Sequence, residues 1–253
     1  TVFQAVRAFL SLTLSLIFVF YLDLGIGALI SSLVLVDLAS LILLIWLNPA
    51  EIKFRFNKIN KSTLNELLQY GSLGLILNVS LLIVSFSDRY IIDFYYDLEE
   101  VGIYDQVSKI SQLSVMALIT VYFNTINPTL IKELDSNFKG SLTKIQNYLY
   151  PFVLIGIPII AYLSFFSEEL AGILLGIDFR SGYLMMPYFF VATYVYGFSN
   201  FFELRLKFSN QLKWLGSIAI ITAILNIVLN LVFVAKFGYH WAAYTTLFSY
   251  VFM

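Results

Sequence analysis

Eight long apolar segments constrain this chain more than any other feature of its sequence. They cover roughly residues 3–22, 25–47, 71–96, 103–130, 148–166, 183–204, 214–234 and 241 onward. A helix needs roughly 20 apolar residues to cross a bilayer, whereas barrel strands alternate apolar and polar residues over about ten positions. These segments do not alternate, and lipid leaves helices as the remaining choice. The sequence predicts an all-α integral membrane protein, a polytopic bundle of about eight transmembrane segments with the last one truncated.

Composition excludes most soluble functions. Only 12% of the residues are charged, against about 25% in soluble domains, and the mean hydropathy is +0.85. The net charge of −1 and the lack of a basic stripe predict no nucleic-acid partner. With no cysteine and one histidine, we expect no metal site and no cofactor. The sequence has no phosphate-binding glycine loop, no triad-like set and no large outer loop, so we expect a transporter and not an enzyme.

The distribution of Lys and Arg among the connections predicts the orientation of the chain in the membrane. One side receives Lys53, Arg55, Lys58, Lys61, Lys132, Lys139, Lys144, Arg205, Lys207 and Lys213. The opposite side receives only Arg180 and Lys236. The positive-inside rule therefore places segment 48–70 in the cytoplasm. The chain opens at Thr1 without an initiator Met and stops within an apolar run, so we expect a fragment of a longer membrane protein.

Residues 49–70 differ from the other connections. They contain the basic stretch IKFRFNKINK, and Thr63 to Glu66 then fit a capping box. Leucines follow at helical spacing, which predicts a short amphipathic helix on the inner membrane surface. The alternative is an ordinary basic loop. Either way, this linker divides a two-helix block, residues 1–48, from a six-helix block, residues 71–253.

Ionisable residues inside membrane spans are costly and are treated as functional candidates. Asp88 and Arg89 lie about seven residues before the outer end of the third span, and Lys109 about seven residues after the outer start of the fourth. Arg89 and Lys109 should therefore sit at similar depth, forming an anion site with Asp88 as a partial counter-ion. The alternative is an internal ion pair between Asp88 and one of the two cations.

Three further polar residues are candidates for lining a cavity. Asp37 lies midway along the second span, as a cavity wall or a protonated carboxyl. Asn226 and Asn230 are four residues apart and share one helix face. They can hydrogen-bond across helices as a packing contribution or line a polar cavity, and packing is the favoured interpretation.

Three stretches of the six-helix block carry a family resemblance. The first, residues 67–113, contains Asp88-Arg89-Tyr90-Ile91-Ile92, then Val101-Gly102-Ile103-Tyr104 and Lys109. The second is NTINPTLIKEL, and the third is TAILNIVLNLVFVAKFGYHWAAYTTLFSY. Together they resemble the O-antigen and capsule repeat-unit flippases of the multidrug/oligosaccharidyl-lipid/polysaccharide exporter superfamily. Many members have a proline early in the helix where this chain has Ser72-Leu73-Gly74.

The resemblance implies a two-half, pseudo-symmetric transporter of which residues 1–48 are the last two helices of the first half and residues 71–253 are the second half. It implies that the parent protein flips undecaprenyl-diphosphate-linked oligosaccharides across the bacterial plasma membrane for lipopolysaccharide or capsule synthesis. Arg89 and Lys109 would attract the anionic head, with Asp88 moderating them. Membrane lipids, a polysaccharide polymerase and glycosyltransferases are the partners it suggests.

Two other functions stay open at this stage. A cation-coupled multidrug exporter of the same superfamily would rely on acidic cavity groups such as Asp37 and Asp88. A membrane-embedded polysaccharide polymerase or ligase would need a large outer loop with catalytic Arg or His, which this sequence lacks.

Overall fold

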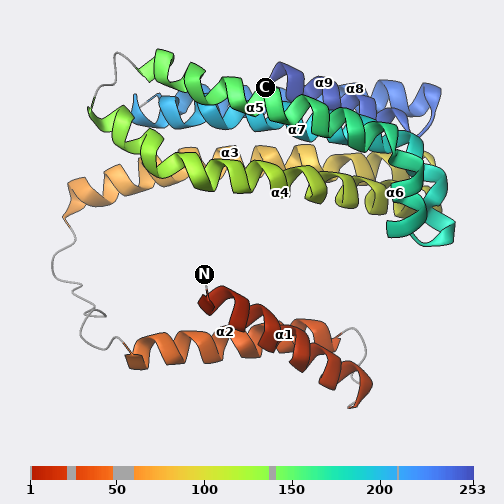
Figure 1. Cartoon of the computed structure of the whole chain (residues 1–253), viewed down its shortest axis with the longest axis horizontal. Helices are drawn as coiled ribbons and strands as arrows, with labels where there is room; N and C mark the ends of the chain where they lie inside the picture. The colour runs from red at the N-terminus through yellow and green to blue at the C-terminus, as the bar shows by residue number, and fades with distance from the viewer. Residues whose placement is uncertain (1, 22–26, 48–59, 137–140, 210) are drawn as a thin grey trace. The chain divides into compact units, whose positions relative to one another are not determined.

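The structure is a computed structural model, and it describes residues 2–21, 27–47, 60–136, 141–209 and 211–253. Every regular element in these ranges is helical, so the predicted all-α class is confirmed (Figure 1). The chain divides into two compact units, residues 1–63 and residues 64–253.

The first unit contains a pair of helices, α1 (Val2–Phe20) and α2 (Gly27–Leu47), that pack along each other. The polar contacts between them include a pair of hydroxyl groups and an ion pair. The hydroxyl oxygens of Ser15 and Ser32 lie 2.5 Å apart, and Arg7 of α1 pairs with Asp37 of α2.

The second unit is built on six long helices with two short ones between them. The long helices are α3 (Lys61–Tyr95), which begins at the unit boundary, α4 (Leu98–Ser136), α5 (Ser141–Phe165), α7 (Met186–Phe208), α8 (Leu212–Phe237) and α9 (Trp241–Phe252). The short helix α6 (Ser167–Leu174) and the 3-10 helix η2 (Ile177–Met185) connect α5 to α7 at one end of the bundle. The most extensive helix contacts are those of α7 with α4 and of α9 with both α7 and α8.

Each of the eight apolar segments predicted from the sequence coincides with a helix. Five helices of the described chain are long and apolar enough to cross a membrane: those containing 30–47, 61–95, 98–136, 143–165 and 213–237. The chain is therefore a multi-pass membrane protein. The total of eight spans and the pseudo-symmetry of two halves stay predictions.

Half of the predicted linker, residues 49–59, lies outside the described residues. From Lys61 onward its residues are the first turns of α3, which runs without interruption to Tyr95. Thr63 therefore lies inside the first helical turn and is not the residue that caps it. The division of the chain at residues 48 and 71 into parts of two transporter halves stays a prediction.

Two short turns determine which residues face each other across the helix pairs. Only Tyr96 and Asp97 separate α3 from α4. Residues 238–240 separate α8 from α9, and Gly238 there has φ +106°, a conformation that residues with a Cβ rarely adopt. Because both connections reverse the chain tightly, residues equally distant from a turn lie side by side in the two helices that it joins.

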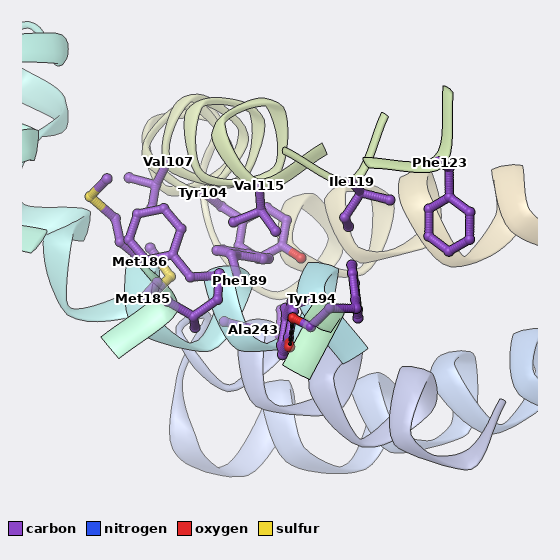
Figure 2. Packing of buried hydrophobic residues seen from close by; sticks show 14 of the residues in the cluster. Tyr104, Val107, Val115, Ile119, Phe123, Met185, Met186, Phe189, Tyr194 and Ala243 are labelled. Carbon is purple, nitrogen blue, oxygen red and sulfur yellow. Dashed lines mark hydrogen bonds between the residues drawn. The ribbon is translucent and has the colours of Figure 1, made fainter. Parts of the chain in front are cut away.

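A hydrophobic core fills the space between α4, α7 and α9. Figure 2 shows its members, with Tyr104 and Val107 of α4 close to Met186 and Phe189 of α7. The rings of Tyr104 and Phe189 meet edge to face with centroids 5.4 Å apart. The glycine Gly182 permits η2 to lie close to α4. A Cβ at Gly182 would lie 2.5 Å from the Val107 side chain.

Helix α3 is attached differently from the other helices of its bundle. Its backbone makes few close approaches to the described neighbouring helices, so side chains bridge most of the distance to α4 and α8. One buried group links it to both, as described below.

Candidate functional site

Asp88 of α3 is the centre of a buried polar group, which we call the Asp88 cluster: Ser87, Asp88, Tyr104, Asn226, Asn230, Thr245 and Thr246. The Asp88 side chain is almost fully buried. The Tyr104 hydroxyl and the Thr246 hydroxyl, the latter at 2.8 Å, donate to Oδ2 of the carboxylate. Nδ2 of Asn230 donates to its Oδ1 at 2.5 Å. The carboxylate therefore receives donors from α4, α8 and α9.

The two tight turns explain why these residues meet. Asp88 lies eight residues before Tyr96, and Tyr104 lies eight residues after it. Asn230 lies eight residues before Gly238, and Thr246 eight residues after it. Each pair is therefore opposed across its own turn, and the cluster joins the two helix pairs to each other.

The two asparagines of α8 have different surroundings within the cluster. Asn230 is completely bonded through Asp88, Asn226 and the Thr245 hydroxyl, which donates to its Oδ1 at 2.5 Å. Oδ1 of Asn226 accepts from Ser87 at 2.9 Å, whereas its Nδ2 is buried without a partner among the described residues. Both side chains are shielded completely from solvent.

Arg89, the next residue of α3, belongs to a second group with Asp105 and Lys109, which we call the charged triad. Nε of Arg89 lies 2.5 Å from Oδ1 of Asp105, and Nζ of Lys109 lies 2.6 Å from Oδ2. One carboxylate thus pairs with two cations, leaving one net positive charge. The Arg89 guanidinium also donates to the Ser85 carbonyl and lies 4.9 Å from the centre of the Phe86 ring.

The triad differs from the prediction in its counter-ion. Asp105, and not Asp88, pairs with Arg89 and Lys109, while Asp88 is bonded to neutral donors. The reason is the length of the turn between α3 and α4. The sequence prediction started the second helix near Gly102, whereas α4 begins at Leu98, so the residue opposite Arg89 is Asp105 and Lys109 lies one helical turn further along.

Exposure within the triad is uneven. Arg89 and Asp105 are mostly buried, with 19% and 18% of their side chains exposed, whereas the Lys109 side chain is 56% exposed. Lys109 is thus a cation with free donor hydrogens, and it lies beside Arg89, which is more buried. Ammonium and guanidinium groups held in this way bind phosphate oxygens through charge-assisted hydrogen bonds.

Asp37 belongs to the other unit and has a partner that the sequence reasoning missed. Nη2 of Arg7 lies 2.6 Å from its Oδ1, and Nε of the same guanidinium donates to that oxygen at 2.7 Å. Asp37 therefore takes part in an ion pair that joins α1 and α2.

Several members of the site were not singled out from the sequence. Asp105 stands four residues before Lys109, the spacing of a helical ion pair, and this signal identifies it. Tyr104, Thr245 and Thr246 carry no such signal, since these residue types are common in membrane helices. Across the described ranges, no three His, Cys, Asp or Glu side chains gather as a metal site.

A perturbed titratable group lies outside the spans, at Tyr239. Burial raises the pKa of the Tyr239 phenol in the turn between α8 and α9, and the carboxylates of Glu100 and Glu99 raise it further. The phenol is therefore neutral at neutral pH. At this end of the bundle, the acidic side chains at the start of α4 approach the α8–α9 turn.

Comparison with known proteins places the chain among proteins of glycan assembly. A family model described as polysaccharide biosynthesis protein matches residues 1–182, most of the chain. The chain is also 22% identical over 214 residues to Agl15 of Haloferax volcanii, named as a probable low-salt glycan biosynthesis flippase. That alignment covers 84% of this chain but 45% of the relative, so the chain spans less than half of the relative's length. No solved structure matches the chain.

The match covers the DR-x-II and VGxY stretches, which contribute Asp88, Arg89 and Tyr104 to the Asp88 cluster and the charged triad. The prediction of a polysaccharide flippase family from these stretches is confirmed at the level of the family. On the extent of the family match, the chain belongs to the polysaccharide biosynthesis protein family.

Proposed function

We propose that the protein to which this chain belongs flips an oligosaccharide linked to undecaprenyl diphosphate from the inner to the outer leaflet of a bacterial plasma membrane. No bond is broken, so the chain needs no catalytic group and acts as a transporter, not an enzyme. The oligosaccharide would serve lipopolysaccharide or capsule synthesis, where a polymerase and glycosyltransferases are the neighbouring activities.

One observation carries this proposal: the charged triad has one net positive charge and lies on two helices that are long and apolar enough to cross a membrane. Arg89 and Lys109 would bind the diphosphate, while Asp105 keeps both cations in place when no substrate is bound. Asp105 takes the moderating role that the sequence assigned to Asp88. Since a buried unpaired cation is costly, a shared counter-ion allows two cations to remain charged between transport events.

The competing functions have less support from the described residues. A cation-coupled multidrug exporter would use Asp37 and Asp88 as open acidic groups, yet Asp37 pairs with Arg7 and Asp88 is bonded on both oxygens. A polymerase or ligase would present catalytic groups on a large outer loop. The connection between α5 and α7 is instead the pair of short helices α6 and η2.

Gene deletion and complementation test the proposal in the full-length protein. Deletion should remove surface polysaccharide and cause the lipid-linked precursor to accumulate, and wild type should restore the polymer. Arg89→Ala should fail to restore it while the protein stays in the membrane at normal abundance. Normal polysaccharide in the Arg89→Ala strain would contradict the proposed role of the triad, and an unchanged deletion strain would contradict the flippase function.

A further inference from the structure

A polar pocket of about 380 Å³ lies between α3, α7 and α8, apart from the Asp88 cluster and the charged triad. Its size is at the lower end for small-molecule sites, which run from about 300 to 1,000 Å³. It adjoins a small apolar cluster in which leucines of α3 pack against α7 and α8. The other described pockets of this unit are lined almost entirely by apolar side chains, whereas this one is lined about equally by polar and apolar groups.

Helix α7 supplies most of the polar lining. Tyr196, Asn200, Glu203 and Lys207 follow each other at intervals of four, three and four residues, so they lie on one face of the helix. Glu203 and Lys207 form an ion pair at 2.5 Å. Polar faces of membrane helices point toward protein or a water-filled cavity, because exposing them to lipid is costly. Here the face lines the pocket.

The two asparagines of the pocket leave hydrogen-bond acceptors free. Nδ2 of Asn78 on α3 donates to the Gly74 carbonyl at 2.8 Å, and Nδ2 of Asn200 donates to the Gly197 carbonyl at 3.3 Å. The amide oxygens of both make no hydrogen bond within the described chain. Together with the Glu203 carboxylate they accept hydrogen bonds, while Lys207 and the Tyr196 hydroxyl can donate.

This lining matches one ligand chemistry: a small molecule with several hydroxyl groups that both donate and accept. A sugar ring has this pattern, and its apolar faces suit the leucines of α3 that complete the wall. The pocket also shares a face of α3 with the charged triad. Asn78 stands eleven residues before Arg89, which is three helical turns, so both point the same way about 16 Å apart.

We propose that this pocket is a sugar-binding subsite that recognises the glycan part of the substrate while the charged triad binds its diphosphate. This inference rests on the proposed flippase function and adds a place where sugars are selected. A short oligosaccharide can span the distance along α3. The subsite would then make the protein specific for its own repeat unit, which the triad, with its contacts to phosphate alone, cannot do.

Glycine substitutions on α3 provide a matched pair of variants. A Cβ at Gly74 or at Gly71 meets no atom within 4 Å, and leucine is a better helix former than glycine. Both Gly74→Leu and Gly71→Leu should therefore fold. Gly74 lines the pocket and Gly71 does not, so only the first fills it. Asn200→Ala removes an acceptor instead of filling space, with Asn124→Ala on the exposed side of α4 as its control.

The experiment measures binding to the purified full-length protein in lipid nanodiscs. The probes are sugar-free undecaprenyl diphosphate and the lipid-linked precursor extracted from the deletion strain. Wild type, Gly71→Leu and Asn124→Ala should bind the precursor at least about tenfold more tightly than the sugar-free carrier. Gly74→Leu and Asn200→Ala should bind both probes alike, at the wild-type affinity for the sugar-free carrier.

The outcomes separate this inference from the function on which it rests. If Gly74→Leu and Asn200→Ala keep the preference for the precursor, or if wild type has none, the sugar subsite is overturned while diphosphate binding stands. If wild type binds neither probe, or no precursor accumulates in the deletion strain, the flippase function itself fails.

Discussion

Asp88 and Arg89 are neighbours on α3, yet they belong to groups with opposite properties. Asp88 is almost fully buried and receives hydrogen bonds from three neutral side chains on three other helices. Arg89 shares a carboxylate with a lysine whose side chain is more than half exposed. The carboxylate of Asp88 is therefore saturated by protein donors, whereas the charged triad has a surplus positive charge that a ligand can balance.

The difference shows that an ionisable residue in a membrane helix does not indicate a binding site by itself. Its environment decides which role it has. Neutral donors that saturate a carboxylate fix the helices around it, and a charge that is only half balanced attracts a counter-ion. If this distinction is correct, substitutions in the Asp88 cluster should change stability, and those in the triad should change binding.

The largest effect is expected for Asp88→Leu, which leaves three buried donors without an acceptor. Hydrogen bonds inside membranes contribute roughly 0.6–1.7 kcal/mol each, so the free energy of unfolding should fall by about 2–5 kcal/mol. Thermal unfolding of the full-length protein and its abundance in the membrane would show the loss. Asp93→Leu, an exposed acidic residue on the same helix, is the control. A stable Asp88→Leu protein would break the distinction.

Arg89→Gln should have the opposite profile. A hydrogen bond to a charged group contributes roughly 1.5–3 kcal/mol, and about 1.4 kcal/mol is a factor of ten in affinity. The affinity for undecaprenyl diphosphate should therefore fall by about ten- to a hundredfold, with little change in the unfolding temperature. Arg180→Gln, which removes an arginine of η2, should bind normally. A variant that unfolds early and still binds would place Arg89 among the structural residues.

Asp105→Asn sharpens the comparison because it removes the carboxylate that pairs with both cations of the triad. Both cations then act on the ligand without competition, so the affinity for undecaprenyl diphosphate should rise a few-fold at low ionic strength. The gain should shrink as salt is added, since salt screens exposed charges. Titrations at two salt concentrations would test this, and a loss of affinity would mean that Asp105 mainly positions the two cations.

The smallest effect is expected for Lys109→Gln. Its side chain is 56% exposed, and exposed ion pairs contribute roughly 0.2–1 kcal/mol. The affinity for the diphosphate should fall by no more than about fivefold, and Lys109→Arg should recover it. A loss as large as that of Arg89→Gln would show that the two cations act as one unit.

The sequence predicts the helices of this fold because each apolar run is long enough to require one in lipid. It does not predict the rotation of the helices or the lengths of the turns, and these determine which residues face each other. The error at Lys109 illustrates this point: a turn four residues shorter than expected brings Asp105 opposite Arg89. With the turn placed at Tyr96 and Asp97, the same counting along the two helices puts Tyr104 opposite Asp88 and Asp105 opposite Arg89.

Other parts of the site needed three-dimensional information. Asn226 and Asn230 share a face by their spacing, and packing was the favoured interpretation, but nothing in the sequence pairs them with Asp88. Asp37 was a candidate because of its position within a span, whereas its partner Arg7 lies in a separate helix thirty residues away. Contacts between helices depend on side-chain packing, which hydropathy does not record.

The depth of the charged triad has an electrical consequence. Arg89 and Asp105 each lie six or seven residues from the end of their helix at the α3–α4 turn, about 10 Å along the helix axis. That is roughly a third of the hydrocarbon thickness of about 30 Å. A full crossing of the membrane potential changes the energy of one charge by about 2.3 kcal/mol per 100 mV. An anion that reaches the triad from this end would therefore gain or lose about 0.8 kcal/mol per charge for each 100 mV. The fraction of the triad occupied by an anion would thus depend on the membrane potential. It would differ between a cell that maintains a potential and a vesicle that has none.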